Sequence, residues 1–263
     1  MKKKESILII GGTGFIGSNF ILKYKNKYNI TSLSKNPINY HKIEGVTYFD
    51  MINFLGYSNK SYDYIISCFG TIDHSDYFNE GKNFLREYIN SFIDIIDILD
   101  LKKIKKLIHI GSADEYGISN IPINENVQEN PLSAYGVSRL TVTNLLRMIS
   151  RSYSIPIVVL RIFLPYGPGQ GGKKIIPHII KNCLLEKKFH LSSGLQNKDF
   201  CYIDDIVEAI HCAFKNNSSP NIVYNIGNGI PISIKKLTYK IIDIIGHGKP
   251  IFKKSVENEI LDN

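Results

Sequence analysis

The sequence predicts an α/β fold, a doubly wound parallel sheet with a small C-terminal lobe. Three observations carry this prediction. A short apolar run at residues 6–10 enters a glycine-rich turn, and runs of strand length then alternate with helical periodicity up to residue 160. Beyond residue 160 that rhythm changes. Such an alternation, joined by right-handed crossovers, gives a parallel sheet covered by helices on both faces.

Six strands are expected in this first part, each a short apolar run bounded by turn residues. They span residues 6–10, 29–33, 46–49, 62–67, 106–110 and 155–160. Apolar side chains at helical spacing predict helices at residues 15–25, 77–101 and 132–151, with Pro131 opening the last of them.

After residue 160 we expect a loop at residues 165–172, a helix at 173–188 and a return to the sheet from residue 200 through a helix ending near 214. Residues 224–226 form another predicted strand, and Ser233 caps a last helix that ends near residue 245. We therefore assign residues 1–162, with 196–228 returning to them, to the sheet domain. Residues 163–195 and 229–263 form the predicted lobe.

The glycine turn is the most informative stretch. Gly12, Gly14 and Gly17 fit G-x-G-x-x-G, while Gly11, Gly14 and Gly17 follow a three-residue spacing. Without Cβ atoms, the backbone N–H groups of the turn can approach a pyrophosphate, and the helix beginning near Phe15 directs its positive end at it. Glycines also serve ordinary turns, but their place after an N-terminal strand favours a dinucleotide-binding Rossmann domain. Gly11, Gly14, Phe15, Ile16 and Gly17 are the predicted contacts.

Composition narrows the class of partner. The chain has 263 residues, 43% hydrophobic and 21% charged, which is typical of a globular protein. No apolar run approaches the roughly 20 residues of a membrane span, and the basic residues 1–5 lead into a strand without a cleavage site, so we expect a cytoplasmic protein. The net charge of +8 suits an anionic partner, and a small nucleotide-type molecule fits better than a nucleic acid because no basic stripe is interleaved with aromatics.

The four cysteines have neither C-x-x-C spacing nor a metal-ligand pattern with histidine. We interpret them as buried or half-buried free thiols in a reducing compartment, and we expect no metal site.

The end of the second strand predicts the cofactor. An acidic residue at this place bonds the ribose 2′-OH of NAD, but here the strand ends in Ser34-Lys35. A hydroxyl and an ammonium attract a 2′-phosphate, so the sequence favours NADP(H) over NAD(H), although Lys35 also fits an ordinary solvated loop. Asp50 and Met51, after the third strand, are placed for the adenine edge, where Asp50 could equally be a turn carboxylate.

Cys68 and Gly70, where the chain turns away from the fourth strand, complete the predicted cofactor contacts. Downstream of the fifth strand comes Ser112, and the helix after Pro131 carries Tyr135 and Arg139 four residues apart, on one face. A cation one turn away stabilises a phenolate and lowers the pKa of a tyrosine, which suits proton exchange with an oxygen at a carbon undergoing hydride transfer. Ser112 would hydrogen-bond that oxygen.

These stretches make the chain resemble the extended short-chain dehydrogenases/reductases, in the nucleotide-sugar epimerase, dehydratase and ketoreductase group. The matching segments are GGTGFIG at residues 11–17, GSADEYG at 111–117, SAYGVSR at 133–139, PYGPGQ at 165–170, QNKDFCYIDDI at 196–206 and YNIGNG at 224–229. The resemblance implies that Ser112 and Tyr135 form the catalytic pair. It also aligns Asn90 with a structural or proton-relay asparagine, and implies a homodimer joined through the helices at residues 77–101 and 132–151, although both features also fit ordinary packing.

The chain departs from that resemblance at several positions. Arg139 stands where the family usually has a lysine that also binds the nicotinamide ribose; arginine keeps the charge but does not release its proton. Leu164-Pro165 replaces Asn-Val, which weakens an expected diphosphate contact, and Lys198 replaces an arginine. Members of the family usually continue for several tens of residues beyond the position of residue 263 and carry a further arginine for the diphosphate there. We therefore expect a small substrate-binding lobe, in which Lys253-Lys254 would take the place of that arginine.

The resemblance and the residues together predict a function. Dehydratases of this group place Asp-Glu directly after the serine or threonine, whereas this chain has Ala113-Asp114. With Asp114, Leu164 and Lys198 as substrate contacts, we predict NADPH-dependent reduction of the 4-keto group of a nucleotide-activated 4-keto-6-deoxy sugar. The alternatives are an epimerase or dehydratase that retains NAD and, because of Arg139, a dinucleotide-binding protein without turnover.

Overall fold

The computed structural model describes residues 4–35, 42–50, 53–54, 61–119, 122–215 and 222–254. Seven strands of the described chain form one sheet. They are β1 (Ser6–Ile10), β2 (Asn29–Leu33), β3 (Thr47–Phe49), β4 (Tyr64–Ser67), β5 (Lys106–Ser112), β6 (Ile157–Ile162) and β11 (Ile222–Ile226). All are parallel, in the order β11-β6-β5-β4-β1-β2-β3. The predicted doubly wound parallel sheet is confirmed.

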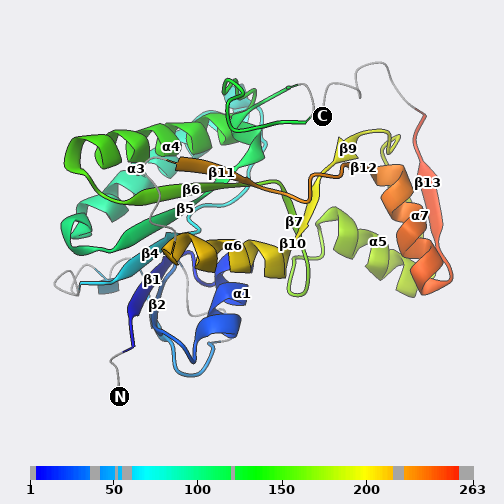
Figure 1. Ribbon diagram of the computed structural model, residues 1–263. Coiled ribbons are helices and arrows are strands. Elements are labelled where there is room, and N and C mark those ends of the chain that lie inside the picture. The colour runs from blue at the N-terminus through cyan, green and yellow to red at the C-terminus, as the bar shows by residue number, and fades with distance from the viewer. Residues whose placement is uncertain are drawn as a thin grey trace.

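Both faces of the sheet are buried, as the continuous apolar runs require. Along β1, Ile7 and Ile9 enter one core with helices α1 (Phe15–Tyr24) and α6 (Ile203–Lys215), while Leu8 and Ile10 enter a second core. That second core packs beneath helices α3 (Lys82–Asp97) and α4 (Ala134–Tyr153). In Figure 1 the sheet accordingly lies between two helical layers.

The predicted helix at residues 77–101 is not continuous. A π-helical turn at Tyr77–Gly81 comes first, and Asn79 inside it has non-helical backbone angles (φ −91°, ψ −112°). The carboxylate of Asp76 accepts a hydrogen bond from the N–H of Phe78 and starts this turn. The regular helix α3 then ends at Asp97, and a 3₁₀ turn follows at Leu101–Lys103.

The small lobe contains helices α5 (Ile175–Leu184) and α7 (Ile234–Ile245) and strands β8 (Lys188–Leu191) and β13 (Lys249–Phe252). Figure 1 shows it to the right of the main sheet. Its own core consists of Ile179, Cys183, Phe189, Leu191 and Ile241.

Two predictions about this second part were wrong in detail. The helix expected at residues 173–188 ends at Leu184, because Glu186 takes a left-handed conformation (φ +51°) and Lys188 already belongs to β8. The loop expected at residues 165–172 begins inside a short strand, β7 (Leu164–Tyr166), which pairs with β10 (Phe200–Tyr202).

Other local predictions agree with the structure. The hydroxyl of Ser233 accepts a hydrogen bond from the N–H of Lys236 at 3.2 Å and caps α7, as predicted. Strand β12 (Ile232–Ser233), just before this helix, pairs with β9 (Asn197–Lys198) and ties the lobe to the segment returning towards the sheet.

The four cysteines are free thiols: Cys183 and Cys201 are buried, Cys68 is half-buried, and Cys212 is exposed, contrary to the expectation of burial. No cluster of three or more metal-ligating side chains occurs among the described residues. Within those same residues, no helix has the length and apolarity to span a bilayer.

His109 makes the folded state sensitive to pH. It is fully buried in β5, with Nδ1 3.1 Å from the hydroxyl of Ser67, and burial holds its pKa well below the ordinary value of 6.5. As the pH falls below 6.5, the unfolded chain therefore binds a proton that the folded chain does not. Full stability is present above pH 6.5 and is lost below it, by about 1.4 kcal/mol for each pH unit.

Urea unfolding between pH 7.5 and 5.5 tests this prediction. We expect His109→Gln to remove the corresponding part of the pH dependence, whereas His190→Gln, at an exposed position of β8, leaves it intact. Equal slopes for wild type and His109→Gln would contradict the assignment.

Candidate active site

The glycine loop lies at the carboxyl ends of β1 and β4. The N–H of Gly11 donates to the carbonyl of Leu33 at 2.7 Å, and the N–H of Gly14 donates to the carbonyl of Gly11 at 2.9 Å. Gly11 has φ +81°, and a Cβ at Gly17 would lie only 2.6 Å from the carbonyl oxygen of Gly11. These positions need glycine because the loop, the neighbouring strand and α1 approach one another closely.

The start of α1 fits an anion. Gly14 precedes the helix in an extended conformation and has no side chain to cap the first turn. The backbone N–H groups of Phe15, Ile16 and Gly17 lie in that first turn, where a helix has no intrahelical acceptors. Together with the helix dipole, they form a site suited to a pyrophosphate at the switch point of the strand order.

The end of β2 closes one side of this loop. The hydroxyl of the buried Ser34 accepts a hydrogen bond from the N–H of Thr13 at 3.3 Å, and Lys35 is exposed beside it. No Asp or Glu occurs between the start of β2 and Lys35. Asp50, after β3, accepts hydrogen bonds from the backbone and side chain of Asn53, so it acts as a local cap. Met51 lies outside the described residues.

Ser112 is the last residue of β5 and begins a tight 3₁₀ turn. Its hydroxyl donates to the carboxylate of Asp114 at 2.9 Å and accepts from the N–H of Asp114 at 3.2 Å. The backbone N–H of Ser112 donates to Glu115 Oε1 at 2.9 Å. The turn therefore fixes both the backbone and the hydroxyl of Ser112, and brings Asp114 next to it.

A buried ion pair supports this turn. The guanidinium of Arg161 donates to Glu115 Oε2 at 2.9 Å, and neither side chain is exposed. Arg161 also donates to Glu129 at 2.7 Å and lies over the ring of Tyr116. Thr143 of α4 donates to Glu115 Oε2 at 2.9 Å. Glu115 thus connects Ser112 to β6 and α4 in a network that no sequence pattern predicted.

Tyr135 and Arg139 share one face of α4, as their spacing predicts. Ser133 caps the helix by accepting a hydrogen bond from the N–H of Gly136 at 3.0 Å. The guanidinium carbon of Arg139 lies 5.4 Å from the centre of the Tyr135 ring, and both side chains are buried. The exposed imidazole of His74 meets the Tyr135 ring edge-on at 5.2 Å between centres. Sequence reasoning missed His74, because nothing in its segment marks it.

The group beside Arg139 is Tyr88 and not Asn90. Arg139 Nη1 donates to the hydroxyl of Tyr88 and, at 2.8 Å, to the carbonyl of Phe69. Helix α3 buries Tyr88 and Phe92, four residues apart, whereas Asn90 lies between them on the exposed side. Asn90, which the resemblance aligns with a structural or proton-relay asparagine, therefore lies on the exposed side of α3, and Tyr88 is the α3 residue that contacts Arg139.

Cys68 and Gly70 follow β4 next to these groups. The N–H of Cys68 donates to the carbonyl of Ile10 at 2.9 Å, and its own carbonyl faces Gly11. Gly70 has φ +98° and packs against the ring of Tyr88. Both positions thus adjoin the glycine loop and the Tyr88–Arg139 pair.

A hollow of about 460 Å³ lies between the small lobe and β7. Leu164 and Lys198, two of the predicted substrate contacts, both line it. His178 and His190 also line it, together with Lys173, and none of these three had been singled out by motif. Lys253 and Lys254 are exposed after β13 and are not among the residues lining this hollow.

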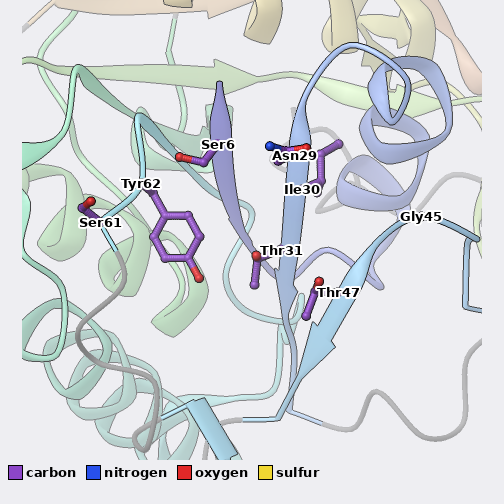
Figure 2. Close-up of a pocket in the computed structure, with 8 residues that line it drawn as sticks. All are labelled: Ser6, Asn29, Ile30, Thr31, Gly45, Thr47, Ser61 and Tyr62. Atoms are coloured by element: carbon purple, nitrogen blue, oxygen red, sulfur yellow. The ribbon is translucent and has the colours of Figure 1, made fainter. Parts of the chain in front are cut away.

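A second hollow, of about 530 Å³, opens at the amino ends of β1 and β2. Figure 2 shows the polar residues Ser6, Asn29, Thr31 and Tyr62 around it. Open parallel sheets bind their ligands at the opposite, carboxyl ends of the strands. We therefore place the candidate active site at the glycine loop, Ser112 and Tyr135.

With this geometry established, comparison with known proteins identifies the family. A sequence model of the NAD dependent epimerase/dehydratase family matches residues 7–227. The chain belongs to this family.

Its relatives carry out different reactions. The chain is 30% identical, over 97% of its length and 87% of the relative, to a putative UDP-glucose 4-epimerase of Methanocaldococcus jannaschii. It is 28% identical over 91% of its length to a dTDP-D-glucose 4,6-dehydratase of Dictyostelium discoideum, of which the match spans 62%. A dTDP-4-dehydro-6-deoxyglucose reductase of Escherichia coli is 32% identical over 46% of this chain and 40% of the relative.

Solved structures share the fold. The UDP-glucuronic acid 4-epimerase of Bacillus cereus, in complex with UDP-glucuronic acid and NAD, superposes with a TM-score of 0.84 at 24% identity. The superposition covers 97% of this chain and 88% of the epimerase.

The Arg161–Glu115 pair yields a stability prediction. Arg161→Met leaves the carboxylate of Glu115 buried without its cation, and we expect the free energy of unfolding to fall by about 3–5 kcal/mol. Arg147→Met, which removes a partly exposed partner of Glu129, should cost less than about 1 kcal/mol.

Urea unfolding measures both effects. Because the double variant Glu115→Gln/Arg161→Met contains no unpaired buried charge, it should recover part of the loss. Equal effects of Arg161→Met and Arg147→Met would contradict this account of the network.

Proposed function

We propose that this chain reduces the 4-keto group of a nucleotide-activated 4-keto-6-deoxy sugar with NADPH. The observation that carries the proposal is the end of β2, where the hydroxyl of Ser34 contacts the glycine loop, the exposed Lys35 follows directly, and residues 29–35 include no Asp or Glu. A carboxylate there would repel a 2′-phosphate, whereas these two groups attract one.

The residues of the loop fit a dinucleotide. Gly11, Gly14 and Gly17 leave room where any Cβ would meet backbone, and the N–H groups of Phe15 and Ile16 are available for the pyrophosphate. Asp50, Met51, Cys68 and Gly70 are the further proposed contacts. Bound NADPH would supply a hydride to the carbonyl carbon at C4 of the sugar.

The chain's own residues would complete the reaction. The hydroxyl of Tyr135 would deliver a proton to the C4 oxygen, and the hydroxyl of Ser112 would polarise the same carbonyl. To do so, Ser112 would exchange its bond to Asp114 for one to the substrate. Arg139 would stabilise the phenolate left on Tyr135 by its charge alone, since a guanidinium does not lose its proton.

The hollow beside the lobe is the proposed place of the nucleotide diphosphate. Lys198 and Lys173 bring positive charge to it, and Leu164 supplies apolar surface. Asp114, bonded to Ser112, is the proposed contact on the sugar side. The residue directly after Ser112 is Ala113, where dehydratases of this group have an aspartate. Its absence favours a reductase over a dehydratase.

A 4-epimerase that retains NAD is the second candidate. The likeness to a UDP-glucose 4-epimerase over nearly the whole chain favours it. An epimerase takes a hydride and returns it, so it keeps its dinucleotide through the cycle. Denaturing the purified protein and identifying any released nucleotide separates this candidate from a one-way reductase. A dinucleotide-binding protein without turnover is the third candidate, favoured by Arg139 in the place of lysine.

Turnover tests the reductase proposal directly. We expect the absorbance of reduced nicotinamide to fall when the protein meets NADPH and the 4-keto-6-deoxy sugar of dTDP, UDP or GDP. Removing the proton donor in Tyr135→Phe should lower kcat by about 10²–10⁴-fold. Absence of NADPH oxidation with all three nucleotides would reject the reductase.

Lys35 tests the choice of dinucleotide. A charge-assisted contact to a phosphate is worth about 1.5–3 kcal/mol, so Lys35→Glu should weaken NADPH binding by about 10–100-fold. NADH binding should change by less than about threefold, because NADH has no phosphate at this position. Lys102→Glu, the same charge change in the exposed turn before β5, is the matched control for calorimetry. Equal losses for NADPH and NADH in Lys35→Glu would exclude a 2′-phosphate contact.

A further inference from the structure

Arg139 is held more firmly than a cation on a helix face usually is. Its Nη1 has two hydrogens, one donated to the carbonyl of Phe69 and one to the hydroxyl of Tyr88. The hydroxyl of Tyr88 donates its own proton to the same carbonyl at 3.3 Å. The three groups form a closed triangle that fixes Nη1 of the guanidinium.

The surrounding fold makes room for this triangle. The Tyr88 ring is 4% exposed and lies against Gly70, where a Cβ would overlap it. Phe69 and Phe84 pack on the ring at 5.1 and 5.7 Å between centres. A tyrosine with so little freedom places its hydroxyl reproducibly.

The guanidinium also lies close to Tyr135 while its Nη1 is occupied. Its carbon lies 5.6 Å from the centre of the Tyr88 ring and 5.4 Å from that of Tyr135, so it contacts both rings. Nε of Arg139 is buried and has no hydrogen-bond partner among the described residues. Arginine therefore differs from lysine at this position, because one nitrogen is held by the fold while further N–H donors remain on the same rigid plane.

Arg139 carries a buried positive charge next to Tyr135, and titratable side chains lie around it. Burial lowers the pKa of Arg139, but Tyr88, Tyr135 and Glu115 together hold it above its ordinary range. Burial raises the pKa of Tyr88. It also raises the pKa of the Cys68 thiol to about 12 and keeps His109 neutral.

On the side facing solvent, Tyr135 has the exposed imidazole of His74.

We propose that Tyr88 is a positioning residue for proton transfer at Tyr135, because its hydroxyl anchors Arg139 to Phe69 and so fixes a permanent positive charge over the Tyr135 ring. This role rests on the proposed function, in which Tyr135 exchanges the proton. Tyr88 touches neither substrate nor dinucleotide in this role and acts only through Arg139.

The ionisation of Tyr135 reads out this role without turnover. Phenolate absorbance is titrated in the protein and in Tyr135→Phe, and the difference isolates Tyr135. In the Tyr88→Phe background we expect the midpoint to rise by about 1 pH unit, a tenfold loss of phenolate at a given pH below the midpoint. Tyr24→Phe is the matched control, because it removes the partly buried hydroxyl of a core tyrosine, bonded to Glu208, on the other face of the sheet.

A second background separates positioning from general packing. With Arg139→Met there is no cation to position, so Tyr88→Phe should then shift the midpoint by less than about 0.3 pH unit. Far-UV circular dichroism and urea midpoints establish that each variant is folded. If Arg139→Met does not fold, the Tyr88→Phe shift measured against Tyr24→Phe decides alone.

An unchanged Tyr135 midpoint in Tyr88→Phe would overturn the proposal, as would an equal shift in the two Arg139 backgrounds. Failure of the proposed reaction is distinguishable from these results. A chain that shows the coupled titration but does not oxidise NADPH retains the anchor and loses only the reductase assignment.

Discussion

The geometry of the candidate active site depends on the buried Arg139, which lies next to the buried Tyr135. A cation with only 7% of its surface exposed needs partners, since the cost of removing it from water is several kcal/mol. Phe69 supplies a carbonyl at the turn after β4, and Tyr88 supplies a hydroxyl from α3. Arg139 itself comes from α4. Three elements that meet at the carboxyl ends of the strands therefore converge on one guanidinium.

A second buried arginine supports the other half of the site. Arg161 on β6 pairs with Glu115, and Glu115 accepts a hydrogen bond from the backbone of Ser112. The two arginines thus play different parts. Arg161 holds the turn that carries Ser112, while Arg139 lies against the ring of Tyr135.

Much of this arrangement could be predicted from sequence because its signals are local. The strand, glycine turn and helix at the N-terminus follow from apolar runs and spacing, and so does the shared face of Tyr135 and Arg139. Tyr88 lies on the apolar face that helical spacing predicts for residues 77–101, and it is buried. Its contact with Arg139, however, joins α3 to α4 and depends on how the two helices pack, which spacing within one helix does not show.

Parts of the small lobe could not be predicted from the sequence either. Strand β7 has only three residues, one of them Pro165, so its sequence is typical of a loop. It forms a strand because it pairs with β10, which lies far along the chain. His178 and His190 come from different elements, α5 and β8, and line the same hollow only through the packing of the lobe. Contacts of this kind depend on tertiary structure, which periodicity does not report.

The most direct test of the account is a crystal structure of the protein with NADP⁺. We predict the pyrophosphate at the N–H groups of Phe15 and Ile16, the 2′-phosphate beside Ser34 and Lys35, and the nicotinamide ring beside the hydroxyl of Tyr135. A nicotinamide ring far from Tyr135, with the guanidinium of Arg139 turned away from it, would contradict the account.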